Sequence, residues 1–336
     1  MVGAIVMATD ATGTRIVGEG WHERFGGPHA EVRALAEAGD AARGATLYVT
    51  LEPCCHTGKT PPCTDAILAA GIARVVVAAG DPFPAVAGQG LARLRAAGVI
   101  VEEGLLAEEA IRLTAPYRKL VRTGRPWVIA KWAMSLDGRL ANPPGDDRWI
   151  SSAESREIVH DLRRRVDAIL VGIGTVLADD PLLTARPAGE RRGPRIVCDG
   201  LARTPPESQL VRSAREWPVL VAVGPRADPE RVAVLAAAGC EIWHGSADPQ
   251  GRFVALLDEL GRRRMTNLLV EGGPTILEGL FTHRLVDEVW AFVAPTIIGG
   301  VTPPFIVAPQ LDAEEVSLPG GDILIRGLVR PTSGRG

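Results

Sequence analysis

The 336-residue sequence has few cysteines and few aromatic residues, and neither sign of charge is in large excess. Five cysteines, three of them within residues 54–63, do not form the spread-out pattern of a disulfide framework. Lys and Arg total 37 and Asp and Glu total 40, and the resulting net charge of −3 argues against binding to nucleic-acid phosphates. No apolar run approaches the roughly 20 residues of a membrane span, and no secretory signal is recognisable. These absences predict a cytoplasmic globular protein that binds neither nucleic acid nor membrane.

The length predicts two domains, at roughly 150 residues each. Short β-rich runs alternate with helical patterns, which predicts an α/β fold with mainly parallel sheets. Gly124 and Pro126 interrupt the chain between a long predicted helix over Leu105–Arg122 and a predicted strand over Trp127–Trp132. We therefore expect one domain over residues 1–123 and a second over residues 124–336, with a closing strand over Ile323–Leu328.

One histidine and two cysteines of the first domain follow the order of a zinc site. An H-x-E motif at His29 and Glu31 precedes a P-C element at Cys54 and a later Cys63, the pattern of zinc-dependent base deaminases. One imidazole and two thiolates fill three positions of a zinc tetrahedron and leave the fourth for water. We predict one Zn²⁺ on His29, Cys54 and Cys63, with Glu31 as the catalytic proton carrier. Cys55 competes with Cys54, which is favoured because it directly follows the proline.

The surrounding segments resemble the bifunctional deaminase/reductase family of riboflavin biosynthesis. The resemblance rests on G-G-P-H-A-E-V over residues 26–32, Y-V-T-L-E-P-C over 48–54 and G-K-T-P-P-C over 58–63. It implies a cytidine-deaminase-like fold and, as substrate, 2,5-diamino-6-(5-phosphoribosylamino)pyrimidin-4(3H)-one. It also implies that four residues line the substrate pocket: His22, His56, Lys59 and Asp81. From the residues alone, Lys59 is equally well a solvated loop lysine.

The chain departs from the family pattern at three places. The family's first helix and an Asn-Pro step have no counterpart before Val2, for which we expect a miscalled start codon or a trimmed domain. Cys55 stands where Ser is usual, and Phe83 stands where a ligand-contacting Asn is usual. These departures support one alternative, a reductase whose deaminase domain is inactive. The second alternative is a nucleic-acid base deaminase, which the net charge disfavours.

The second half resembles the reductase part of the same family. The matching segments are K-W-A-M-S-L-D-G-R over 131–139, W-I-S over 149–151, A-I-L-V-G over 168–172, G-T-V-L-A-D-D-P over 174–181 and V-E-G-G-P-T over 270–275. From the residues alone, two glycines before a helix favour a cofactor phosphate, and no G-x-G-x-x-G follows a first strand. The resemblance implies a dihydrofolate-reductase-like domain. It would use NADPH to reduce the ribosyl group of 5-amino-6-(5-phosphoribosylamino)uracil to ribityl.

The resemblance also assigns residues of this half to the two ligands. Four should contact the substrate: Lys131, Arg163, Arg186 and Glu271. Six should contact NADPH: Trp149, Thr175, Asp179, Gly273, Pro274 and Thr275. Arg163 and Arg186 suit a 5′-phosphate because guanidinium donors form a fork, although Arg163 lies in a run of arginines that also suits a solvated helix face. Because the family forms oligomers through this half, we expect a homo-oligomer that acts on phosphorylated pyrimidines.

Overall fold

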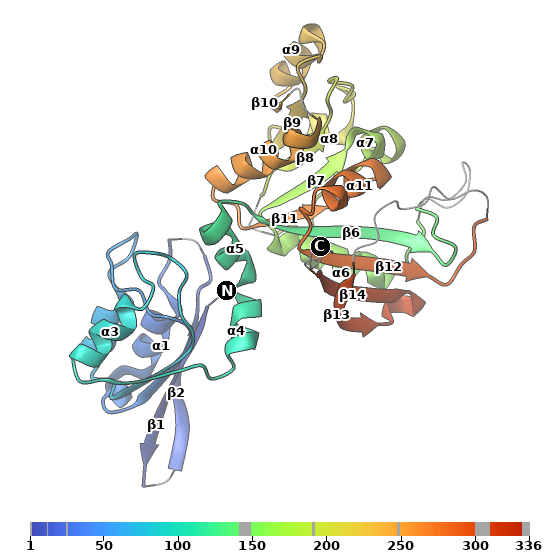
Figure 1. Ribbon diagram of the computed structural model, residues 1–336. Coiled ribbons are helices and arrows are strands. Elements are labelled where there is room, and N and C mark those ends of the chain that lie inside the picture. The colour runs from blue at the N-terminus through green and yellow to red at the C-terminus, as the bar shows by residue number, and fades with distance from the viewer. Residues whose placement is uncertain are drawn as a thin grey trace, which may run out of the picture. The chain divides into compact units, whose positions relative to one another are not determined.

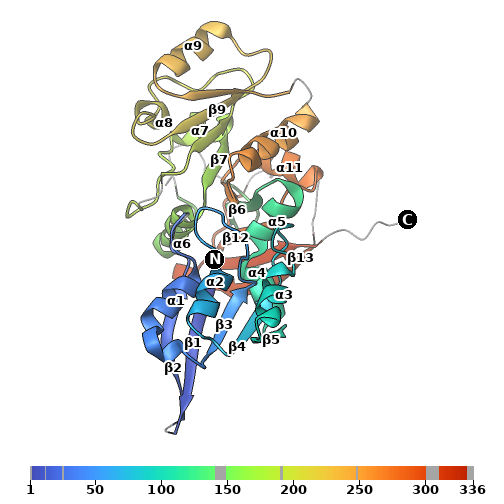
Figure 2. The same ribbon diagram turned by 90° about the vertical axis from the view of Figure 1, so that its left-hand side faces the viewer.

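The structure is a computed structural model that describes residues 2–11, 13–24, 26–140, 149–189, 192–246, 249–299 and 310–330. The chain divides into two compact units, residues 1–123 and residues 124–336, referred to as unit 1 and unit 2. Each unit is a sheet flanked by helices (Figures 1 and 2). Within the described residues, no helix is long and apolar enough to cross a membrane.

Unit 1 contains a five-stranded sheet, among its described residues, in the order β2-β1-β3-β4-β5. The strands are β1 (Gly3–Asp10), β2 (Gly13–Trp21), β3 (Thr46–Leu51), β4 (Arg74–Ala79) and β5 (Ile100–Glu103). The helices are α1 (Ala30–Ala38), α2 (Cys63–Ala69), α3 (Gln89–Ala96), α4 (Ala107–Leu113) and α5 (Ala115–Thr123). β1 pairs antiparallel with β2 and β3, whereas β3, β4 and β5 run parallel.

Close packing of α1 on β2 fixes the position of the N-terminus of α1, where the predicted zinc ligand His29 lies. A Cβ atom at Gly18 or Gly20 would lie only 2.2 or 2.3 Å from a carbonyl oxygen of α1, so glycine is required at both positions. The face of α1 that contacts the sheet is made of small and branched side chains, including the buried Ala30, Ala34 and Leu35. The N-terminus of α1, preceded by His29, is thereby held at one end of the sheet.

The prediction of a single helix over Leu105–Arg122 is wrong. The structure contains two helices, α4 and α5, separated at Thr114. The buried Thr114 hydroxyl donates a hydrogen bond to the Ala110 carbonyl at 2.7 Å. Threonine that bonds back to the preceding turn competes with the helical backbone and favours a bend, which is the local reason for the interruption.

The buried carboxylate of Glu52 holds together the loops at the carboxyl ends of β3 and β4. Glu52 is 3% exposed, and it accepts backbone N–H bonds from Asp81 at 3.2 Å, Gly88 at 3.0 Å, Gly90 at 3.1 Å and Leu91 at 3.4 Å. Charge-assisted bonds to a carboxylate are stronger than neutral ones, which offsets the cost of burying the charge. The segment that leads from β3 to the predicted ligand Cys54 is therefore held in place by the bonds of Glu52 to the neighbouring loop and helix.

Unit 2 contains a nine-stranded sheet, among its described residues, in the order β10-β9-β8-β7-β11-β6-β12-β14-β13. The strands are β6 (Trp127–Ser135), β7 (Ala168–Gly172), β8 (Arg195–Cys198), β9 (Val219–Val223), β10 (Glu241–His244), β11 (Asn267–Val270), β12 (Glu288–Ala294), β13 (Leu311–Ser317) and β14 (Ile323–Val329). The strands from β10 to β12 run parallel, and β14 and β13 pair antiparallel. The predicted closing strand is β14.

Helices cover both faces of this sheet. They are α6 (Ala153–Arg165), α7 (Ile173–Asp179), α8 (Gln209–Arg212), α9 (Pro229–Ala237), α10 (Pro249–Arg262) and α11 (Pro274–Thr282). Two separate clusters of buried side chains pack against the sheet, which explains why strands such as β7 and β9 are apolar throughout. Because the parallel strands share one direction, the residues that follow β6, β7, β8 and β11 gather at one edge.

We predict that Glu52→Ala destabilises the protein by about 3 kcal/mol or more, because it leaves several buried N–H groups without an acceptor. Urea unfolding of the full chain measures the change. The matched control is Glu103→Ala, whose side chain is 47% exposed and pairs with Arg95 at 2.6 Å. An exposed pair contributes at most about 1 kcal/mol. Equal effects of the two substitutions would contradict the anchoring role of Glu52.

Candidate active sites

Three donor side chains of unit 1 converge at the end of its sheet. His29 is the N-cap of α1, Cys54 follows β3, and Cys63 is the first residue of α2. His29 Nδ1 lies 3.2 Å from Cys63 Sγ and 3.6 Å from Cys54 Sγ, and the three donor atoms all lie within 4.8 Å of one another. Two ligands of a tetrahedral zinc ion stand about 3.5 Å apart, given bonds of about 2.0–2.3 Å. The spacing of these three donors therefore fits one zinc ion.

Neighbouring polar groups orient the donor atoms. Thr60 Oγ1 lies 3.4 Å from His29 Nε2, which leaves Nδ1 as the nitrogen that faces both sulfur atoms. The Cys63 backbone N–H donates to Cys54 Sγ at 3.3 Å. A hydrogen bond to the remote nitrogen of a histidine fixes the ring and the tautomer of a metal ligand. Thr60 is a contributor that the sequence motif alone does not indicate.

The Cys55 thiol points elsewhere. It donates to the Ala85 carbonyl oxygen at 3.6 Å and is not in the donor group. The residue that follows the proline, Cys54, is thus the one that the backbone directs toward His29 and Cys63. The Ser-to-Cys departure at position 55 leaves the donor set complete.

Burial and hydrogen bonds shape the electrostatics of this cluster. Glu31, in the first turn of α1, is 3% exposed, and burial raises its pKa, partly offset by the charge of His29. A hydrogen bond from the Cys63 thiol lowers the pKa of Cys54 to about 4, and donation of that bond raises the pKa of Cys63. A buried carboxyl group beside a metal-ligand set is the arrangement expected of a general acid and base.

Two of the four predicted substrate residues lie against the segment that carries His29. The His22 ring lies edge-on to His29, with 5.5 Å between ring centroids, and burial together with the His29 charge lowers the His22 pKa. Lys59 is exposed, and its Cδ atom lies 3.5 Å from where a Cβ on Gly26 would be. The loop that carries Lys59 therefore packs against the G-G-P-H segment.

The other two residues, His56 and Asp81, are fixed by aromatic neighbours. The His56 ring lies 5.7 Å from the ring of Phe83, and within the described part of the chain its buried Nδ1 has no hydrogen-bond partner. Asp81 accepts the Tyr117 hydroxyl at 2.9 Å and 3.2 Å and the Phe83 N–H at 2.8 Å. Burial raises the pKa of Asp81. Phe83 therefore still holds Asp81 through its backbone.

In unit 2, Lys131, Arg163 and Glu271 form a buried charge cluster. Arg163 donates to both carboxylate oxygens of Glu271, at 2.6 and 2.9 Å, and to the Thr184 carbonyl at 3.2 Å. Lys131 Nζ lies 4.0 Å from Glu271. Burial alone would raise the pKa of Glu271, but the Arg163 charge lowers it below its usual value. Burial lowers the pKa of Lys131, with Glu271 opposing that shift. Arg163 is thus committed to Glu271 and does not lie on a solvated face.

Arg186 lies beside this cluster and is exposed. It and Arg163 act on His160, whose pKa is lowered by burial and by these two positive charges. His160 Nδ1 is buried and, among the described residues, has no partner. The motif did not indicate His160, but its position one helical turn before Arg163 on α6 places both side chains on one face.

Four of the six predicted cofactor residues meet at the start of α11. Thr175 Oγ1 lies 3.7 Å from the Cβ position of Gly273, the N-cap of α11. No side chain caps this helix, and Pro274 and Thr275 are exposed. Pro274 has no N–H, and the Ile276 N–H donates to the Gly273 carbonyl at 3.1 Å, so the Thr275 N–H is the amide that this helix start can offer an anion. Asp179 is exposed at the end of α7, and Trp149 lies 5.0 Å under the Arg156 guanidinium. The structure thus joins Thr175 to Gly273–Thr275 and leaves the other two on separate segments.

Two family models match the chain. The RibD C-terminal domain matches residues 126–319, and the cytidine and deoxycytidylate deaminase zinc-binding region matches residues 1–79. The riboflavin biosynthesis protein RibD of Aquifex aeolicus is 42% identical, over 89% of this chain and 81% of that protein. RibD of Escherichia coli is 41% identical, over 92% of this chain and 89% of that protein.

Solved structures agree with these matches. A deaminase/reductase from Thermotoga maritima has a TM-score of 0.82 and 34% identity, over 98% of this chain and 92% of that chain. Acinetobacter baumannii RibD, form 1, has the same TM-score and 32% identity over the same shares. The predicted α/β class, with a cytidine-deaminase-like domain before a reductase domain, is confirmed. The chain therefore belongs to the RibD family of bifunctional riboflavin-biosynthesis enzymes.

Proposed function

We propose that the chain catalyses two consecutive reactions of riboflavin synthesis. Unit 1 hydrolytically deaminates 2,5-diamino-6-(5-phosphoribosylamino)pyrimidin-4(3H)-one, and unit 2 uses NADPH to reduce the ribosyl group of 5-amino-6-(5-phosphoribosylamino)uracil to ribityl. The Thermotoga maritima relative is named a deaminase and reductase of this substrate class. The observation that carries the proposal is the complete His29–Cys54–Cys63 donor set beside buried Glu31. The alternative of an inactive deaminase half is not favoured, because both parts of that constellation are in place.

In the deaminase half, each residue has a distinct task. His29, Cys54 and Cys63 would hold a zinc ion, which when bound would supply a water of lowered pKa. Glu31 accepts the proton that this water gives up and delivers it to the departing amino group, which leaves as ammonia. The raised pKa of Glu31 brings its proton affinity closer to that of the groups it serves. Four residues bind the substrate, with Lys59 toward its phosphate: His22, His56, Lys59 and Asp81.

The reductase half would hold NADPH, which when bound would supply a hydride for C1′ of the ring-opened sugar. Lys131 and Glu271 contact the sugar, and Arg186 binds the 5′-phosphate. Arg163 acts through Glu271, because its donors are directed to that carboxylate and to the Thr184 carbonyl. Gly273–Thr275 and Thr175 bind the cofactor near its pyrophosphate, with Asp179 and Trp149 completing its site.

The setting of the enzyme belongs to the same proposal. It acts in the cytoplasm, as a homo-oligomer, on small phosphorylated pyrimidines and without nucleic acid. All five cysteines are free thiols, which suits a reducing compartment. The formal charge of −3 provides no surplus of cations for a nucleic-acid backbone.

We predict that Cys54→Ser loses zinc, because a thiolate ligand is removed from the donor set, whereas Cys55→Ser retains about one zinc per chain. Metal analysis of the purified proteins measures this difference. The Cys55 variant is the matched control, since it makes the same atomic change one residue away. Zinc loss in the Cys55 variant alone would show that the ligand assignment is wrong.

Glu31→Gln should retain zinc and lose deamination, because an amide cannot carry the proton. Ammonia release and zinc content are measured on the same preparation. Reduction of supplied deaminated substrate should proceed at the wild-type rate, since it uses unit 2. Joint loss of both activities would contradict independent sites.

Arg186→Ala should raise KM for the phosphorylated reductase substrate about 10- to 100-fold, because a charge-assisted contact is lost. KM for the same compound without its phosphate should change little. Arg164→Ala is the control, since Arg164 is exposed and pairs with Asp161 on the same face of unit 2's α6. An equal loss with both substrates would mean that Arg186 has a structural role.

A further inference from the structure

Three glycines lie just beyond the carboxyl ends of the adjacent parallel strands β8, β9 and β10, and Arg252 of α10 packs against all three. A Cβ on Gly200 would lie 2.9 Å from Arg252 Nη1, and one on Gly224 would lie 3.4 Å from Nη2. A Cβ on Gly245 would lie 3.1 Å from Arg252 Cγ. The absence of side chains at these positions lets the guanidinium lie directly over the strand ends.

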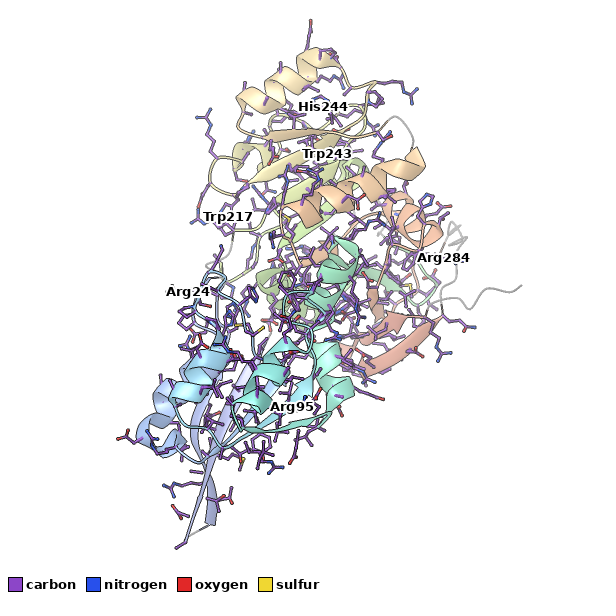
Figure 3. All side chains as sticks on the ribbon, turned by 60° about the vertical axis from the view of Figure 1, so that its left-hand side comes forward. Arg24, Arg95, Trp217, Trp243, His244 and Arg284 are labelled. Carbon is purple, nitrogen blue, oxygen red and sulfur yellow. The ribbon has the colours of Figure 1, made fainter. Side chains whose placement is uncertain are left out.

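The Arg252 guanidinium has no carboxylate partner among the described residues. Its Nε donates to the Ser246 carbonyl at 3.3 Å, and no described residue accepts a bond from Nη1 or Nη2. The ring of Trp243, labelled in Figure 3, also lies against Gly245, where a Cβ would be 2.8 Å from a ring carbon. The Arg252 side chain is thus packed against the strand ends, and its terminal nitrogens Nη1 and Nη2 are available to bind a ligand. Arg163, with Glu271 in its fork, is the opposite case.

A carboxylate at the same edge is buried beneath the surface. Asp199, which follows β8, is fully buried, and its Oδ2 accepts the Thr204 N–H at 2.6 Å and the Thr204 hydroxyl at 2.7 Å. In parallel-sheet dinucleotide sites, an acidic side chain after a strand binds the ribose 2′-hydroxyl of NAD, and an arginine accommodates the 2′-phosphate of NADP. Here the acid is buried with Oδ2 bonded to Thr204, its Oδ1 has no hydrogen-bond partner among the described residues, and the arginine is half-buried beside it at the strand ends.

The distance of Arg252 from the start of α11, along the carboxyl edge of the sheet, indicates which anionic group of a bound dinucleotide it could contact. The open start of α11 follows β11, and the strand order from there is β7, β8, β9 and β10. At about 4.8 Å per strand, the ends of β8 and β9 lie roughly 10–15 Å from the end of β11. A dinucleotide whose pyrophosphate lies at Gly273–Thr275 therefore needs a second anionic group on its adenosine half to meet Arg252.

We propose that Arg252 binds the adenosine 2′-phosphate of NADPH and thereby selects NADPH over NADH, an assignment that rests on the proposed reductase function. A guanidinium matches a phosphate dianion with forked donors, and NADH offers it only a hydroxyl. Arg252 is then a specificity residue, since it contacts the cofactor far from the transferred hydride.

The test compares Arg252→Gln with Arg262→Gln, which removes the same charge from the same helix where it pairs with Glu259. Calorimetric titration uses adenosine 2′,5′-bisphosphate and adenosine 5′-monophosphate as probes. Arg252→Gln should weaken the bisphosphate about 10- to 100-fold and leave the monophosphate unchanged. KM for NADPH should rise by a similar factor, with KM for NADH unchanged. Arg262→Gln should alter none of these values.

Equal weakening of the two probes, or no change in either, would overturn the assignment. A thermal unfolding midpoint of Arg252→Gln matching that of Arg262→Gln establishes that the fold is intact, and Arg252→Lys, which keeps the charge but not the fork, should give intermediate affinity. The titration requires no turnover. Failure of the wild-type enzyme to reduce its substrate with NADPH would therefore refute the proposed reaction, and failure of the probes to discriminate would refute only the role of Arg252.

Discussion

The shared direction of the parallel strands is the constraint that places the chemistry in both units. Cys54 follows β3 and Asp81 follows β4, so the loops that carry them meet at one edge of the first sheet. In unit 2, Thr175 follows β7, and Glu271 and Gly273 follow β11, at one edge of the second sheet. A ligand that spans several strand ends can thus be contacted by residues that are distant in sequence.

Buried charge in both units is tolerated because it is paired or hydrogen-bonded. Glu52 accepts four backbone N–H bonds, and Glu271 accepts a bidentate arginine. An unpaired charge in such surroundings would cost several kcal/mol and would shift toward its neutral form. Glu31 is the group whose pKa is raised, in keeping with a site that must take up and release a proton. Glu52 holds loops and Glu271 fixes Arg163. Among the described residues, Glu31 accepts no such arginine or set of backbone bonds from other segments, as its proposed role of proton carrier requires.

The zinc set was predictable because its chemistry lies in short local motifs. His29 and Glu31 are separated by one residue, and proline marks Cys54. Most helices and strands could be predicted from the local periodicity of apolar residues, which is likewise a short-range signal. The break at Thr114 was not predictable, because it depends on a side-chain bond within an otherwise regular helical pattern. β10 and β13 are likewise hard to predict from sequence, since each is short or exposed and gains its conformation from pairing with a neighbour.

The roles of the arginine residues could not be predicted from the sequence, because they depend on contacts between segments that are distant in the chain. Arg163 and Arg164 are neighbours in a basic run, yet Arg163 is held by buried Glu271 and Arg164 pairs with Asp161 at the surface. Arg252 stands in no motif, and its environment comes from glycines 52, 28 and 7 residues before it, brought together by three strands. The role of a guanidinium depends on what occupies its fork. A carboxylate there makes the residue a support, and an open fork over bare strand ends makes it a site for a phosphate.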